Sequence, residues 1–100
     1  MYKIKIYADV RVDIRNAAAW YENQSEGLGS RFKKQAKAQI QTLGKNALLY
    51  AHRYQDVRCM LLKDFPFMVH YWIDAENDQV HVYGFYHTSL SPASWNRGSK

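Results

Sequence analysis

The segment VRCMLLKDFPFMVHYWIDAENDQVHVYGFYH, residues 57–87, decides the fold of this 100-residue chain. It contains three runs rich in β-branched and aromatic residues, at positions 57–63, 67–74 and 79–87, and such runs favour β-strands. The links at residues 64–66 and 75–78 have the composition of turns. Because links this short can only reverse the chain, the segment predicts an antiparallel meander of three strands.

A further strand is predicted at the start of the chain. Between residues 2 and 8, apolar positions alternate with others, so that one side carries Tyr2, Ile4, Ile6 and Ala8 and the opposite side carries Lys3, Lys5 and Tyr7. A period of two indicates a half-buried strand. If the strand lies at a sheet edge, its outward lysines discourage pairing with another chain.

Two helices are predicted between this strand and the meander. The first has Asp9 as its expected N-cap, and its apolar stripe is Val10, Ile14, Ala17, Ala18 and Tyr21. The second follows the glycine-containing break at residues 25–29, and its stripe is Leu28, Phe32, Ala36, Ile40 and Leu43. Gly44 is expected at the C′ position, where helices commonly end. Helices joined by so short a link fold back on each other as an αα-hairpin.

The predicted element order is therefore β-α-α-β-β-β, with a loop over residues 46–55. Segregated helices and an antiparallel sheet predict a two-layer α+β fold. We expect one domain over residues 1–100, because the length suits a single core and no repeat or low-complexity tract interrupts it.

Composition points to acidic partners. The formal net charge is +5 and the pI is about 9.4, a balance that favours nucleic acid or an acidic protein segment. Cys59 is the only cysteine, which excludes an internal disulfide and suits a reducing cytosol. Neither a signal peptide nor a run of about 18 apolar residues is present, so we expect a cytoplasmic protein without a membrane partner.

Three groups of residues form a further pattern that spans most of the chain. The first is Ala19-Trp20-Tyr21-Glu22, followed by Gly27-Leu28-Gly29 and Phe32. The second is Val57-Arg58, followed by Phe65-Pro66-Phe67-Met68-Val69 and Tyr71. The third is His87, Pro92 and Trp95. Together, and in this order, they resemble the motifs of ParE-like toxins, which belong to the RelE/ParE superfamily of toxin–antitoxin systems.

This resemblance implies a β-α-α-β-β-β fold and the toxin of a type II toxin–antitoxin pair. Such toxins are kept inert by a cognate antitoxin whose helix and extended tail wrap around them. ParE-like members poison DNA gyrase without being enzymes themselves, whereas RelE-like members cut mRNA on the ribosome. The resemblance implies no cofactor. We therefore predict a gyrase inhibitor, with a ribosome-dependent mRNA endonuclease as the alternative.

The chain departs from the family pattern at one functional position. Between the family's histidine and proline stands an arginine, but the corresponding segment here is His87-Thr88-Ser89-Leu90-Ser91-Pro92. Leu90 cannot supply the phosphate or carboxylate contact of a guanidinium. A third hypothesis follows, in which the chain is a degenerate, non-toxic binding partner.

An mRNA endonuclease needs a base for the 2′-hydroxyl, an acid for the leaving oxygen and cations for the phosphate. Arg58, Lys63 and His87 are the candidate catalytic residues, with Tyr86 as a further possibility. However, a slip of one residue in strand register would move Arg58 to the other face of the sheet. Arg58 in an edge salt bridge is the competing interpretation.

Residues expected to bind an antitoxin or a target are aromatic, cationic or histidine side chains. They are Trp20, Tyr21, Arg31, Lys34, Arg58, His70, Trp72, His87 and Trp95. Strand alternation places one group on the sheet face away from the helices, namely Met68, His70, Trp72, His81, Tyr83, Phe85 and His87. Antitoxin, target or the C-terminal tail with Trp95 could cover that face. No metal site is expected there, because no carboxylate or thiol converges with the histidines.

Overall fold

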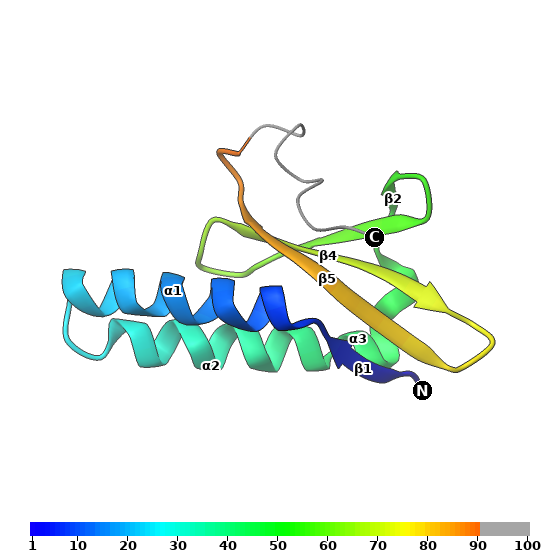
Figure 1. Cartoon of the computed structure of the whole chain (residues 1–100), viewed down its shortest axis with the longest axis horizontal. Helices are drawn as coiled ribbons and strands as arrows, with labels where there is room; N and C mark the ends of the chain where they lie inside the picture. The colour runs from blue at the N-terminus through cyan, green and yellow to red at the C-terminus, as the bar shows by residue number, and fades with distance from the viewer. Residues whose placement is uncertain (91–100) are drawn as a thin grey trace.

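The computed structural model of the chain describes residues 1–90, and the predicted meander forms its centre (Figure 1). Its strands are β3 (Val57–Leu61), β4 (Phe67–Asp74) and β5 (Gln79–His87), paired antiparallel. The last two have the predicted bounds. β3 ends two residues before the predicted position 63, because the Leu62 N–H donates to the Phe67 carbonyl and closes the turn.

Two short strands complete a five-stranded sheet of order β1-β5-β4-β3-β2. β1 (Lys3–Ile6) pairs with β5 in parallel, so the N-terminal strand lies at one edge with its lysines exposed. β2 (His52–Tyr54) lies at the other edge, inside the segment predicted as a loop. The prediction missed β2 because three residues are too few to establish a period of two.

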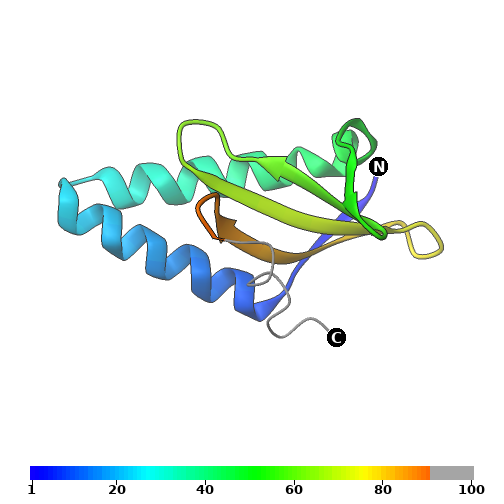
Figure 2. The ribbon, with the colours of Figure 1, turned by 90° about the horizontal axis from the view of Figure 1, so that it is seen from above.

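The helices form a layer on one face of this sheet (Figures 1 and 2). α1 (Ala8–Gln24) and α2 (Leu28–Gln41) are antiparallel and correspond to the two predicted helices. The expected N-cap was wrong, because Tyr7 holds that position and Asp9 lies within the first turn. Tyr7 donates its N–H to the Val82 carbonyl while its own carbonyl accepts the first helical N–H groups, so strand runs directly into helix.

The end of the second helix also differs from the prediction. α2 ends at Gln41, and a short α3 (Leu43–Asn46) and a 3₁₀ turn η1 (Ala47–Leu49) follow. Gly44 lies inside α3 rather than at a left-handed C′ position. Its glycine identity has a packing reason: a Cβ there would lie 3.1 Å from the carbonyl oxygen of Tyr2, the residue just before β1.

The core lies between the helices and the sheet. The stripe predicted for the second helix is buried there, with Phe32, Ala36 and Ile40 of α2 and Leu43 of α3 fully inaccessible. An aromatic cluster surrounds Phe32 at centroid distances of 4.9 to 6.0 Å, and it consists of Tyr21, Phe65, Phe67 and Phe85. The buried hydroxyl of Tyr71 donates to the Ala47 carbonyl at 2.6 Å, which satisfies a polar group inside the core.

A bulge in β5 alters the two sheet faces from the predicted alternation. His70 pairs with Gly84 but Tyr71 pairs with Val82, so β5 holds one extra residue. Phe85 consequently joins the core under the helices, and His87 packs against Phe67 on that side. The prediction that both lie on the opposite face with His70 was wrong. A regular period cannot anticipate an inserted residue.

The observed architecture confirms the two-layer α+β prediction, extended by β2, α3 and the parallel pairing of β1. No helix within residues 1–90 has the length and apolar character needed to cross a bilayer. Pro92 and Trp95, which contributed to the family resemblance, lie outside the described residues.

Candidate functional site

The turn between α1 and α2 is held by one carboxylate. Both oxygens of Glu22 accept backbone N–H groups at the start of α2, from Gly27 at 2.8 Å and from Gly29 at 2.9 Å. These bonds lower the pKa of Glu22 below its ordinary value. Gly27 has a φ of 85°, which glycine adopts without strain. This turn therefore fixes where the two helices meet.

A pH dependence of stability follows from Glu22. A depressed pKa stabilises the folded state above the unfolded value, near 4.5, and this contribution is lost as the pH falls through the folded pKa. We expect Glu22→Gln to melt at a lower temperature than the wild type at pH 7. The difference between the two should shrink on acidification to about pH 3. Thermal melts followed by circular dichroism test this, and a difference independent of pH would contradict it.

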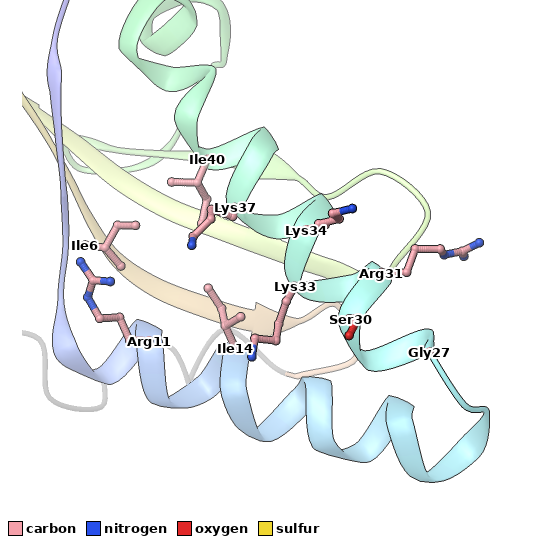
Figure 3. Close-up of a pocket in the computed structure, with 10 residues that line it drawn as sticks. All are labelled: Ile6, Arg11, Ile14, Gly27, Ser30, Arg31, Lys33, Lys34, Lys37 and Ile40. Atoms are coloured by element: carbon pink, nitrogen blue, oxygen red, sulfur yellow. The ribbon is translucent and has the colours of Figure 1, made fainter.

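From this turn the two helices diverge towards β1 and leave a groove of about 660 Å³ between them (Figures 2 and 3). Apolar side chains from three elements line it: Ile6 from β1, Ile14 from α1 and Ile40 from α2. In Figure 3, Lys33 and Lys37 extend from α2 into the space between the helices. The groove is thus an apolar channel edged by long cationic side chains.

The cations of the groove are Arg11, Arg31, Lys33, Lys34 and Lys37. Among residues 1–90, none of those that line the groove is acidic, and none of these five cations pairs with a carboxylate of the described chain. Arg31 turns towards the β3–β4 link, where its guanidinium lies 5.5 Å from the centroid of the Phe65 ring. The groove concentrates positive potential over an apolar surface, an environment suited to an acidic amphipathic partner.

The predicted binding residues of the helices lie in different environments. Arg31 and Lys34 line the groove. Trp20 lies on α1 with 59% of its surface exposed, and its ring meets Tyr21 edge-on. Tyr21 belongs instead to the aromatic cluster of the core, and burial raises its pKa. Lys33 and Lys37 also line the groove, and their spacing of four along α2 places both on one helix face.

The sheet face away from the helices holds a network of tyrosine and histidine. Tyr54 and Tyr83 share a hydroxyl–hydroxyl hydrogen bond, and the Tyr54 hydroxyl also lies 3.1 Å from Nδ1 of His70. His70 is fully buried, and burial together with the charge of Arg53 lowers its pKa to about 4. It is therefore neutral at pH 7. Trp72 lies on the same face, stacked against His81.

The three candidate catalytic residues have different surroundings. The Arg58 guanidinium donates to the carbonyls of Leu48 and Tyr50, near the β2 edge. Lys63 lies in the turn that follows β3, and its N–H donates to the Gln39 side chain. His87 packs against Phe67 on the helix side of the sheet. The expected salt bridge of Arg58 is also absent from residues 1–90, because carbonyl oxygens occupy its guanidinium.

Metal and thiol chemistry have no evident site in the described part of the chain. Within residues 1–90, no cluster of three or more histidine, cysteine, aspartate or glutamate side chains could hold a metal ion. The Cys59 thiol is partly buried, and burial raises its pKa to about 11. A thiol with so high a pKa is a poor nucleophile at neutral pH.

Comparisons with known proteins find similar structures but no similar sequence at the level of a family model or a curated protein. No protein-family model and no curated protein matches the sequence. Among solved structures, a chain of the chromosomal ParDE toxin–antitoxin system of P. aeruginosa is similar, with a TM-score of 0.75, 15% identity, and coverage of 89% of this chain and 98% of that one. The fold is that of the RelE/ParE toxins. The isolated E. coli RelE toxin shares it, with a TM-score of 0.65, 15% identity, and coverage of 94% of this chain and 92% of RelE.

The observed fold is the one that the resemblance in the sequence motifs implied. Part of that motif now has a physical explanation. Glu22, Gly27 and Gly29 build the helix turn, and Phe32 centres the aromatic cluster beside it. These motif residues thus serve the architecture of the RelE/ParE fold, whereas the groove cations lie outside the motif.

Proposed function

We propose that this protein is the toxin of a type II toxin–antitoxin pair, that it inhibits DNA gyrase by binding, and that a cognate antitoxin neutralises it. The observation that carries the proposal is the groove between α1 and α2. Its isoleucine floor and cationic edge fit an amphipathic helix whose apolar face is flanked by acidic residues. Such a segment is the kind of partner that a neutralising antitoxin supplies.

Two further observations favour a gyrase inhibitor over an mRNA endonuclease. The structural likeness to the ParDE chain is greater than the likeness to RelE. In addition, general acid–base catalysis requires its groups within hydrogen-bond reach of one substrate, whereas Arg58 donates to backbone carbonyls near β2 and His87 packs against Phe67 on the helix side of the sheet. Binding without catalysis is the activity that this arrangement supports.

Pulse-labelling after induced expression in bacteria tests the proposed target. We expect DNA synthesis to fall within minutes, before protein synthesis, because a gyrase inhibitor stops replication first. Purified gyrase should then lose supercoiling activity on addition of the protein. An earlier fall of protein synthesis would overturn the gyrase proposal and favour mRNA cleavage.

If neither synthesis falls, the degenerate hypothesis gains support and Leu90 becomes the residue to change. Leu90 is 42% exposed and lines a small pocket with Phe67, Phe85 and His87 at the end of β5. New toxicity in Leu90→Arg, with an inactive wild type, would identify this position as the cause. A wild type that is already toxic would exclude the degenerate hypothesis.

A further inference from the structure

The sheet face opposite the helical groove carries a second chemical arrangement. Tyr7, at the junction of β1 and α1, places its hydroxyl oxygen 3.0 Å from Nδ1 of His81. On the other side of the imidazole, Nε2 lies 3.6 Å from Oδ2 of Asp74. The imidazole of His81 therefore lies between two partners. One is the phenolic hydroxyl of Tyr7, at the N-terminal cap of α1, and the other is the carboxylate of Asp74, at the end of β4. We call this arrangement the line.

The imidazole of His81 is fixed in this line by its surroundings. Its ring stacks on Trp72 with a centroid distance of 4.2 Å and an interplanar angle of 12°, and His81 is only 8% exposed. Nε2 is buried and forms no hydrogen bond with another described residue. When the ring proton is on Nε2, where it faces the Asp74 carboxylate, Nδ1 accepts a hydrogen bond from the Tyr7 hydroxyl.

Asp74 is held as an anion beside the ring. The side chain of Asn77 donates to Oδ2 at 2.9 Å and its N–H donates to Oδ1 at 3.3 Å. These bonds lower the pKa of Asp74 below its ordinary value. A proton taken up by the imidazole of His81 is therefore balanced by a carboxylate that is already charged at neutral pH.

The residue at the hydroxyl end of the line is partly exposed, and a cation leaves the sheet on the same face. Tyr7 is 36% exposed, in contrast to the buried imidazole behind it. Lys5 is the register partner of His81, so both side chains leave the sheet on the same face. Solvent therefore reaches the Tyr7 side chain, and Lys5 adds positive charge to the face of the sheet on which a negative charge would develop.

We propose that Tyr7 is a base-activated nucleophile that takes activated esters of small carboxylic acids, with His81 as its base and Asp74 as a positioning residue. The bond between the phenolic oxygen of Tyr7 and the acyl carbon forms while the phenolic proton passes to Nδ1 of His81. The acyl carbon–oxygen bond of the ester then breaks, and the departing alcohol takes that proton. The product is an acyl-tyrosine, and no redox partner is required. This site is independent of the proposed toxin function.

The test uses the whole protein and p-nitrophenyl acetate at neutral pH, with acetylation mapped by mass spectrometry. Tyr2 and Tyr50 serve as internal controls, because both are partly exposed and neither has a histidine partner among residues 1–90. We expect Tyr7 to be acetylated at least about tenfold faster than either control, since general base catalysis contributes about 100-fold or more when fully effective. Equal rates at the three tyrosines would overturn the proposal without any variant being needed.

Two variants then assign the roles of the partners. His81→Gln should slow acetylation of Tyr7 by about tenfold or more and leave Tyr2 and Tyr50 unchanged. Asp74→Asn should move the midpoint of the pH–rate profile of Tyr7 to lower pH, because the imidazolium loses its counter-charge. A merely structural role of Asp74 would leave that midpoint in place. A wild-type rate at Tyr7 in His81→Gln would exclude His81 as the base.

Discussion

Alanine at position 29 is expected to destabilise the protein by about 3 kcal/mol, the upper range for forcing extra atoms into a packed site. A Cβ on Gly29 would overlap the carbonyl oxygen of Ala18 and lie 2.9 Å from Oε1 of Glu22. The Ala18 oxygen belongs to helical backbone, so it cannot move aside as a flexible side chain could. In a domain of this size the loss corresponds to a fall in Tm of at least about 12 °C, measurable by calorimetry.

The matched control for Gly29→Ala is Ser30→Ala in the same turn of α2. Ser30 is exposed, so its substitution should change stability by no more than about 0.5 kcal/mol. A Gly29→Ala variant within about 1 kcal/mol of the wild type would mean that the two helices can separate at the turn without cost. In that case the close contact of α1 and α2 does not position the groove.

Charge reversal in the groove is expected to have the largest effect on antitoxin binding. The double variant Lys33→Glu/Lys37→Glu replaces two cations that extend between α1 and α2 (Figure 3). If an acidic amphipathic helix occupies the groove, its carboxylates then face like charges, and we expect affinity to fall by about 100-fold or more. The product of the neighbouring small open reading frame, co-expressed and titrated by calorimetry, provides the measurement.

A second double variant separates the groove from net charge. Lys45→Glu/Lys63→Glu lowers the formal net charge from +5 to +1, as does the groove variant, because each lysine-to-glutamate substitution lowers the net charge by two. Lys45 and Lys63 are exposed and do not line the groove. We expect this control to retain affinity within about tenfold and the wild type to lose affinity as salt is raised. Equal losses in the two double variants would show that only overall charge matters.

The helices and strands could be predicted from the sequence wherever their hydrophobic period extended over enough residues to be recognised. β4 and β5 have the predicted bounds, and the stripe of α2 from Phe32 to Ile40 is buried as predicted. The short elements were not predicted, because the three residues of β2 and the four of α3 are too few to show a hydrophobic period. The position of Gly44 was predicted wrongly for a related reason, since its close contact is with Tyr2, a residue distant in sequence.

The candidate site could be predicted from the sequence less completely than the fold. Arg31 and Lys34 were predicted as binding residues and do line the groove. Ile6 and Arg11 were not, because the first belongs to a strand and the second to another helix, and nothing local brings them together. The bulge at Tyr83 likewise moved His87 away from the face on which strand alternation had placed it.

The sequence by itself determined the identity and order of the long elements, the buried stripes of the helices and the excess of positive charge. These properties depend on neighbours within a few residues, so composition and periodicity carry them. Tertiary structure alone decided that β1 lies parallel to β5, that α1 and α2 diverge into a groove, and that Tyr7, His81 and Asp74 stand in line. Each of these depends on contacts between residues far apart in the chain, whose register and separation are set by the packing of whole elements rather than by any local pattern.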